Sequence, residues 1–271
     1  MTNPKWYLRH RLWLDWFVVV NLAFLGPDIF LAHSTNYFRN AWEYVPLVFS
    51  LGAPLVLLAE LAVGGSIGRC FGLAIGWSTV VVGVLGLVLH LESHFFRDYT
   101  LDSLVYTAPF AAPLAYTGLG LLTIMNRTVD ADTPDWSYWV LLLAWGGFVG
   151  NFVFSLADHA QNGFFYLAEW VAVAASALAV GFLLVPLLIV VDRGFLLWCG
   201  AVMLVQAVVG IAGFYFHTTA NLDGPSESLF DNFVYGAPSL APLLFPNLVL
   251  LASIGLWTLR RHLPMKPGIV G

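Results

Sequence analysis

The sequence predicts an all-helical integral membrane protein of about eight transmembrane helices, arranged as two pseudosymmetric four-helix halves. Three observations support this fold class. Hydrophobic residues make up 59% of the 271 residues and charged residues only 10%, a composition that a soluble domain of this size cannot bury. The chain divides into eight apolar segments of membrane-spanning length, and two sequence patterns each occur twice at nearly the same separation.

Each of the eight apolar segments is long enough to cross the hydrocarbon core of a bilayer, which takes roughly 20 helical residues. Their approximate bounds are 12–32, 45–64, 71–91, 102–125, 136–158, 164–191, 195–216 and 230–258. The apolar runs are continuous rather than alternating, and backbone polar groups cannot stay unpaired in lipid, so we expect helices rather than a barrel. The lipid bilayer is therefore the first predicted partner.

The distribution of positive charge predicts the orientation. If the first segment enters from the cytoplasm, nine Lys and Arg residues fall on the cytoplasmic side and two on the outer side. The nine are Lys5, Arg9, Arg11, Arg69, Arg127, Arg193, Arg260, Arg261 and Lys266, and the two are Arg39 and Arg97. Because cytoplasmic connections carry the excess of positive charge, both termini are predicted to be cytoplasmic. No basic stripe occurs, so nucleic acid is not an expected partner.

Two repeated patterns predict a duplication. The pattern D-x-x-V-Y-x-A-P-x-x-A-P-L occurs at 102–114 and at 231–243, 129 residues apart. A looser pattern begins at His33 and at His159, 126 residues apart, and in both places Asn follows by three residues, Phe by five and Glu by ten. We interpret 1–126 and 127–271 as two four-helix halves of one membrane domain. Each half has an even number of spans, so an axis along the membrane normal should relate them.

The outer face concentrates histidines and carboxylates. In each of the four predicted hairpins the first helix ends in His and the second begins with an acid. Ionisable groups near the bilayer are costly and by default suggest function. Imidazole and carboxylate together suit Fe, Cu, Zn or Mn, so we predict a transition-metal centre on the axis between the halves. Its candidate ligands are His33, Glu43, His90, His94, Asp102, His159, Glu169, His217 and Asp231.

Within that set, His90, His94 and His217 are the expected direct ligands, because His90 and His94 are spaced i, i+4 and share one helix face. An open coordination position would permit redox or oxygen-linked chemistry. Tyr106 and Tyr235 lie one turn deeper and would line the pocket. A b-type haem between the halves is a less favoured variant, because no histidine pair lies at mid-membrane.

A structural interpretation of the same residues stays open. The acids can cap helices, where a carboxylate meets the positive helix end, and histidines suit the lipid–water interface. The chain could equally be a non-catalytic subunit of a larger membrane complex, or a homo-oligomer. No catalytic residue is predicted, since the sequence has neither a G-x-S-x-G turn nor a P-loop.

A small-solute or ion transporter is the third interpretation, because parallel repeats with proline-broken helices are typical of transporters. Prolines inside two predicted spans would free backbone carbonyls that could line a cavity. These are Pro109, Pro113, Pro238 and Pro242. Against transport, the predicted spans are poor in charge at mid-membrane. Glu60, near the cytoplasmic end of its span, is expected to pair with Arg69.

Overall fold

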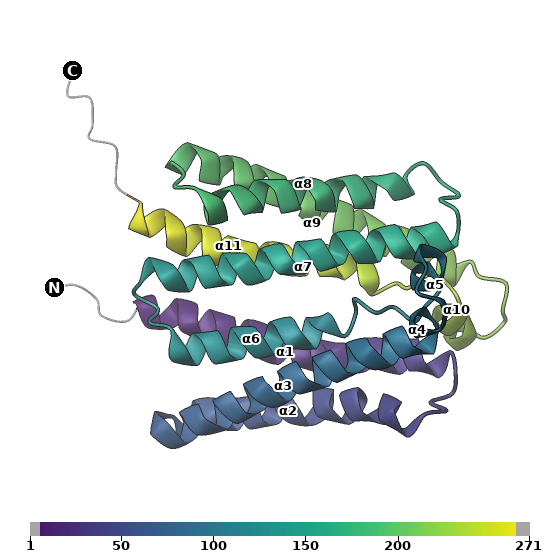
Figure 1. Ribbon diagram of the computed structural model, residues 1–271, viewed down its shortest axis with the longest axis horizontal. Helices are drawn as coiled ribbons and strands as arrows, with labels where there is room; N and C mark the ends of the chain where they lie inside the picture. The colour runs from purple at the N-terminus through teal and green to yellow at the C-terminus, as the bar shows by residue number, and fades with distance from the viewer. Residues whose placement is uncertain (1–5, 264–271) are drawn as a thin grey trace.

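The computed structural model describes residues 6–263, with side chains from His10 onward. Over that range the chain is all-helical and contains no strand (Figure 1), as the sequence predicts. Lys5, the side chain of Arg9 and Lys266, three members of the predicted cytoplasmic set of positive charges, lie outside the described residues.

The described chain consists of long helices and several short helical segments that lie in the connections between some of them. The elements are α1 (Trp6–Ser34), η1 (Ala41–Glu43), α2 (Tyr44–Val63), α3 (Gly65–Ser93), α4 (Phe95–Asp98), α5 (Leu101–Val105), α6 (Leu114–Thr128), α7 (Pro134–Gln161), α8 (Glu169–Leu188), α9 (Arg193–Leu222), α10 (Leu229–Tyr235), η2 (Ala241–Leu243) and α11 (Leu244–His262). Seven helical segments of the described chain are long and apolar enough to cross a membrane. The protein is therefore a multi-pass helical membrane protein.

The predicted spans at 102–125 and 230–258 are not continuous helices, which corrects the sequence prediction. The first is divided into α5, an irregular stretch at 106–113 and α6, and the second into α10, an irregular stretch, η2 and α11. Prolines occupy both irregular stretches, and proline lacks the N–H that a helix interior requires. Because α6 has only 15 residues, it is shorter than the roughly 20 residues of a full span.

The long helices pack in the same order in the two parts of the chain. In the first part α1 packs on α2, α2 on α3, α3 on α6 and α6 on α1. In the second part α7 packs on α8, α8 on α9, α9 on α11 and α11 on α7. Contacts of α6 with α7 and of α1 with α11 join the two parts into one bundle.

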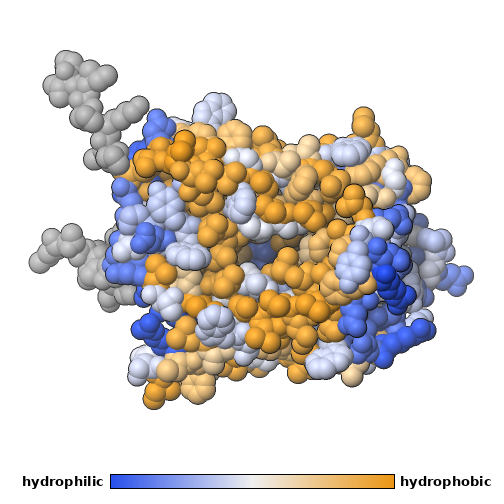
Figure 2. Space-filling model, viewed as in Figure 1, coloured by the Kyte–Doolittle hydropathy of each residue, from blue (hydrophilic) through white to orange (hydrophobic). Residues whose placement is uncertain are grey.

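The bundle has two polar ends and an apolar middle (Figure 2). The short helices α4, α5 and α10 gather at one end, whereas α1 begins and α11 ends at the opposite end (Figure 1). We call the first the histidine end, because the helices bring His33, His90, His94, His159 and His217 there. We call the opposite end the arginine end, because it carries Arg11, Arg69, Arg127, Arg193, Arg260 and Arg261.

Polar contacts cross between the two parts within the apolar middle. Asn247 on α11 donates a side-chain hydrogen bond to the side-chain oxygen of Asn21 on α1. Closer to the arginine end, the rings of Trp13 and Trp257 stack with centroids 6.0 Å apart. These two contacts hold α1 against α11 and so join the two parts of the chain.

Candidate functional site

His33, Glu43 and His90 form the first of two clusters at the histidine end. His33 ends α1, Glu43 ends η1 and His90 lies in the last turn of α3. The Nδ1 atom of His33 is 3.7 Å from Oε2 of Glu43, and the two side chains are 19% and 16% exposed. The His33 and His90 ring centroids are 6.1 Å apart.

His159, Glu169 and His217 form the second cluster. The Nδ1 atom of His159 at the end of α7 is 3.6 Å from Oε2 of Glu169 at the start of α8, and these side chains are 16% and 17% exposed. His217 lies on α9, which packs on α8 and reaches the same end of the bundle. The two clusters thus hold the same residue types in corresponding hairpins.

The repeated His-x-x-Asn-x-Phe pattern forms the same turn in both hairpins. The carbonyl of His33 accepts the N–H groups of Asn36 at 3.3 Å and of Phe38 at 3.2 Å, and the carbonyl of His159 accepts from two residues at the same spacing, at 3.2 and 3.1 Å. Phe38 and Phe164 both adopt the left-handed conformation, with φ of 48° and 53°. This turn reverses the chain and brings the glutamate ten residues after each histidine back to it.

Aromatic rings cover one side of each His–Glu pair. The ring of Phe38 lies 5.8 Å from that of His33 and 4.8 Å from that of Tyr44. In the second hairpin the ring of Phe164 lies 6.1 Å from that of His159 and 4.0 Å from that of Trp170. These aromatic pairs restrict water and hold the imidazoles in place, so both pairs are largely shielded.

A proline carbonyl orients the second histidine of each cluster. His90 donates from Nδ1 to the carbonyl of Pro109 at 2.9 Å, and His217 donates from Nδ1 to the carbonyl of Pro238 at 3.1 Å. Both prolines belong to the D-x-x-V-Y-x-A-P pattern. Metal-binding histidines commonly donate one ring N–H to a carbonyl in this way, which leaves Nε2 to bind a ligand.

One oxygen of each glutamate lacks a hydrogen bond. Oε1 of Glu43 accepts a hydrogen bond from the side chain of Asn36 at 2.9 Å. Oε2 of Glu43 and Oε2 of Glu169 are both buried and have no hydrogen-bond partner among the described residues. A buried acceptor without a partner is unfavourable by about 1–3 kcal/mol, and more when it is charged. In both hairpins the atom nearest to this oxygen is the Nδ1 atom of the paired histidine, at 3.7 and 3.6 Å.

His90, His94 and His217, the expected direct ligands of a single centre, are not found as one group among the described side chains. His90 lies on α3, which packs on α2 and α6, whereas His217 lies on α9, which packs on α8 and α11. His94 is the residue between α3 and α4. The histidines therefore divide between two clusters instead of converging on a common axis.

Asp102 and Asp231 belong to neither cluster. Both are exposed and lie in the first turns of the short helices α5 and α10, where a carboxylate interacts favourably with the helix dipole. Tyr106 and Tyr235 do not line a pocket, since both are 56% exposed. Tyr235 donates a 3.0 Å hydrogen bond to the hydroxyl of Tyr37, and this bond raises the pKa of Tyr235.

No group of three or more His, Cys, Asp or Glu side chains within residues 6–263 is arranged, as it stands, to hold a metal ion. Each cluster has a close His–Glu pair and a second histidine farther away. In each pair the histidine Nδ1 atom and the glutamate Oε2 atom are 3.6–3.7 Å apart, which is too long for a hydrogen bond.

A charged network at the arginine end was not predicted from the sequence. Glu60 binds Arg127 through two hydrogen bonds rather than pairing with Arg69, and Arg127 also contacts Asp15 at 3.2 Å. Asn126 donates to Asp15 at 3.0 Å. The network borders an open cavity of about 570 Å³. Its residues come from α1, α2 and α6, so their sequence separation gave no sign of the contacts.

No family model, curated protein or solved structure matches this chain. The two clusters at the histidine end are the most extensive repeated arrangement of chemically reactive side chains in the described residues.

Proposed function

We propose that the chain is a multi-pass membrane protein whose histidine end carries two divalent transition-metal sites, one in each half. The first site uses His33, Glu43 and His90, and its counterpart uses His159, Glu169 and His217. These are two imidazoles and one carboxylate in each case, a donor set suited to iron, zinc, manganese or copper. The set leaves coordination positions open, which supports redox or oxygen-linked chemistry as the function.

The observation that carries the proposal is the facing pair of donor atoms in each cluster. Two ligand atoms bound to one metal at about 2.1 Å, with an angle of 90–120° between the bonds, lie roughly 3.0–3.6 Å apart. The His33 Nδ1 to Glu43 Oε2 distance is 3.7 Å and the corresponding distance in the second pair is 3.6 Å. Both distances exceed a hydrogen bond and lie close to the spacing of two metal ligands. Both oxygens also lack any hydrogen-bond partner.

The third ligand requires a small movement. Two imidazoles bound to one metal hold their ring centroids roughly 4.6–5.6 Å apart, given a bond of about 2.1 Å and an angle of about 90–120°, and the His33 and His90 centroids are 6.1 Å apart. The Nδ1 atom of His90 already donates to the carbonyl of Pro109, so rotation about that contact can bring Nε2 toward the pair. His217 likewise donates from Nδ1 to the carbonyl of Pro238, at 3.1 Å, which leaves its Nε2 free of that contact.

Duplication and orientation form part of the proposal. Residues 1–126 and 127–271 are proposed to be copies of one unit. The repeated turns, the repeated His–proline hydrogen bonds and the same packing order of the long helices support this. The arginine end is proposed to face the cytoplasm, because positive charge is retained on that side of membranes.

Elemental analysis of the purified protein tests the function. Protein prepared without chelators, or reloaded with Fe²⁺, Mn²⁺ or Zn²⁺ and then desalted, should retain two metal ions per chain. Glu43→Gln and Glu169→Gln should each retain one, and the double variant none. His94→Ala is the matched control and should retain two, because His94 is not a proposed ligand of either site.

Two outcomes contradict the proposal. Wild-type protein that retains no metal after reloading excludes both sites, and solute uptake into liposomes by such protein would favour the transporter. Metal retained at the wild-type level in the double glutamine variant excludes these ligands. A Soret absorption band in the purified protein would show that it binds haem, in place of the two proposed metal sites.

A further inference from the structure

The charged residues of the network at the arginine end have apolar counterparts in the second part of the chain. At the repeat separations of 126 and 129 residues, the corresponding pairs are Asp15 with Leu141, Glu60 with Pro186, and Arg127 with Leu256. All three apolar counterparts are buried. Four helices can therefore pack in this order without charges at these positions. Because charged groups in a membrane protein are costly and by default suggest function, the network calls for a role beyond packing.

The two parts also correspond in space at this level of the bundle. In the first part Asn126 donates a hydrogen bond to Asp15 at 3.0 Å. In the second part Gly255, the counterpart of Asn126, packs so closely on Leu141 that an added Cβ atom would lie 2.8 Å from the leucine side chain. A polar contact between α1 and α6 is thus matched by an apolar contact between α7 and α11.

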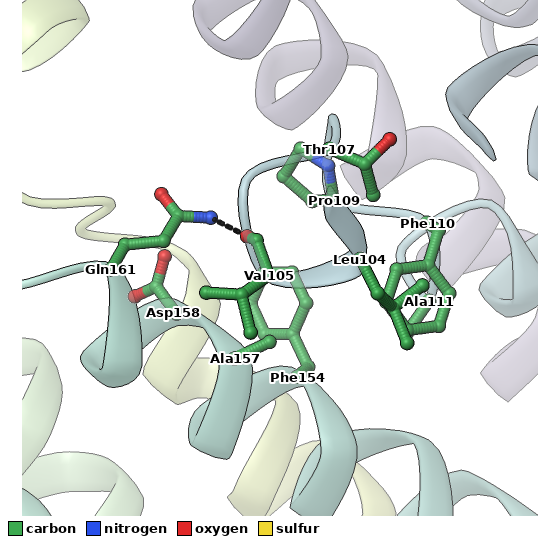
Figure 3. Close-up of a pocket in the computed structure, with 10 residues that line it drawn as sticks. All are labelled: Leu104, Val105, Thr107, Pro109, Phe110, Ala111, Phe154, Ala157, Asp158 and Gln161. Carbon is green, nitrogen blue, oxygen red and sulfur yellow. Dashed lines mark hydrogen bonds between the residues drawn. The ribbon is translucent and has the colours of Figure 1, made fainter. Parts of the chain in front are cut away.

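The network borders a cavity large enough for a ligand. The cavity has a volume of about 570 Å³, is open to the outside and is lined by residues of α1, α2, α3 and α6 and of the connections beside them. Small-molecule sites commonly have volumes of about 300–1,000 Å³. The cavity beside α5 and α7 is only about 20 Å³ (Figure 3), enough for one water molecule, and Gln161 there already donates to the carbonyl of Val105 at 2.7 Å.

Arg127 forms a fixed part of the cavity wall rather than a receptor for a ligand. Its guanidinium donates to both oxygens of Glu60, to Asp15 and to the carbonyl of Thr123. A Cβ atom added to Gly72 of α3 would overlap the Arg127 side chain, so the glycine leaves the space that this arginine occupies. The hydrogen-bonding groups of Arg127 are therefore already used within the network.

Two other arginines line the cavity and have unused donors. Arg11 donates from Nη2 to the carbonyl of Val129 at 2.7 Å, and its Nε atom is buried without a hydrogen-bond partner in the part of the chain that the structure describes. Arg69 is exposed, and within residues 6–263 its side chain forms no ion pair. The planar guanidinium group matches the geometry of phosphate oxygens. Arg11 and Arg69 are therefore suited to bind a phosphate group.

The charge of the lining limits the charge of such a ligand. Three arginines line the cavity together with three carboxylates. Asp15 and Glu60 are held by Arg127, and the third carboxylate, Asp130, is exposed and accepts the N–H of Asp132 at 3.1 Å. Because the lining is neutral overall, a singly charged phosphodiester should be favoured over a doubly charged phosphate.

Backbone N–H groups add to the donors beside Arg69. Gly64 and Gly65 line the cavity with φ of 62° and 64°, a conformation that glycine adopts without strain. A Cβ atom added to either glycine would have no atom within 4 Å, so the backbone is open here. The first N–H groups of α3 have no partner within the helix, and such groups at a helix start favour anions.

Exposed apolar side chains lie on both sides of this glycine turn. Val63 ends α2, and Ile67 and Phe71 lie in the first two turns of α3; these side chains are 63%, 64% and 53% exposed. Apolar surface of this kind on a membrane helix contacts lipid acyl chains. Polar and basic pockets between membrane helices bind lipid headgroups. A cavity with phosphate donors next to acyl-chain contacts therefore favours an amphiphile over a free ion.

We infer that the arginine-end cavity binds the phosphodiester headgroup of a phospholipid through Arg11, Arg69 and the N–H groups at the start of α3. The acyl chains of this lipid lie along Val63 and Ile67. The site is at the opposite end of the bundle from the proposed metal sites and does not depend on them.

Thermal unfolding of delipidated full-length protein in an uncharged detergent tests the inference. Dioctanoyl phosphatidylglycerol should raise the Tm by at least about 2 °C, because a ligand that binds the folded state stabilises it. Dioctanoylglycerol has the same acyl chains without the phosphate, and inorganic phosphate has no chains. At the same concentration and constant ionic strength, neither should raise the Tm by more than a quarter as much.

Variants locate the site. Arg11→Gln and Arg69→Gln should each reduce the lipid-dependent rise in Tm to less than half of the wild-type value. Arg260→Gln is the matched control, since Arg260 is an exposed arginine at the same end that does not line the cavity, and it should leave the rise unchanged. Each variant is compared with its own Tm without lipid, so that a loss of stability caused by the substitution does not enter the result.

Four outcomes would overturn the inference. An equal rise with dioctanoylglycerol would show that the chains alone bind. An equal rise with inorganic phosphate would assign the cavity to free phosphate instead of a lipid. A full rise in both Arg11→Gln and Arg69→Gln would place the lipid elsewhere, and no rise in wild-type protein would exclude the site. None of these results bears on metal retention at the histidine end, so the two proposals fail separately.

Discussion

Arg127 on α6 binds Glu60 on α2 through two of its guanidinium nitrogens, one of them at 2.7 Å from the carboxylate. The same guanidinium contacts Asp15 on α1 at 3.2 Å, and the arginine side chain is only 7% exposed. One residue therefore joins the three helices α1, α2 and α6 at the arginine end. Two carboxylates depend on this single cation within the network.

Replacement of Arg127 by Met should strongly destabilise the fold. It leaves the carboxylates of Asp15 and Glu60 without their shared partner, and removal of one member of a buried ion pair costs about 3–5 kcal/mol. The free energy of unfolding in detergent or lipid micelles measures the loss. Arg69→Met is the control, because Arg69 is exposed and should lose less than about 0.5 kcal/mol. Equal losses in the two variants would contradict the structural role of the network.

The pair formed by Asn21 and Asn247 should stabilise the contact between the halves. Side-chain hydrogen bonds between membrane helices contribute about 0.6 kcal/mol on average and up to about 1.7 kcal/mol. Asn21→Ala and Asn247→Ala should each lower the free energy of unfolding by an amount in this range. The double variant should lose little more than either single variant, and fully additive losses would show that the two amides do not interact.

The left-handed conformation of Phe164 predicts an unusual order of variants. Both Phe164→Ala and Phe164→Gly lose the ring contact with Trp170, but glycine adopts φ near +53° without the strain of a Cβ atom. The glycine variant should therefore unfold at a higher temperature than the alanine variant. The corresponding difference in the free energy of unfolding should be about 1 kcal/mol.

The neighbouring Phe165 provides the control for that comparison. Phe165 is 81% exposed and is not among the residues with positive φ. Phe165→Gly should be no more stable than Phe165→Ala, because glycine has greater conformational freedom in the unfolded chain. If Phe164→Gly is also less stable than Phe164→Ala, the predicted turn geometry is wrong.

The proposed orientation can be tested with a native cysteine. Cys70 is exposed and lies near the start of α3, at the arginine end. If that end faces the cytoplasm, a membrane-impermeant maleimide should label Cys70 only after the membrane is permeabilised. In a Cys70→Ser background, Arg97→Cys at the histidine end should be labelled in intact cells. The reverse labelling pattern would show that the histidine end, and not the arginine end, faces the cytoplasm.

Much of the architecture could be predicted because the necessary signals are local. Apolar composition within each run of about 20 residues identifies a membrane helix without reference to any other part of the chain. The His-x-x-Asn-x-Phe pattern likewise marks a turn whose hydrogen bonds join residues three and five positions apart. Pro109 and Pro238 were recognised as prolines that disturb their spans, but the apolar residues on both sides of them concealed the full separation into two helices. Hydropathy therefore merged α5 with α6 and α10 with α11.

The composition of the candidate site depended on packing. His90 and His94 share a helix face by spacing, and this made them the expected ligand pair. In the folded chain His90 instead faces His33, because the turn after α1 returns Glu43 to the end of that helix and α3 packs on α2. Sequence spacing gives the direction of a side chain relative to its own helix, and it carries no information about the neighbouring helix.

By itself, the sequence determined that this protein is helical and crosses a membrane, and it identified the histidines and glutamates that matter for the proposed sites. The tertiary structure alone decided that these residues form two clusters and that Arg127, rather than Arg69, pairs with Glu60. The physical reason is that hydrophobicity and turn geometry act over a few residues. Contacts among distant side chains arise only when the helices pack.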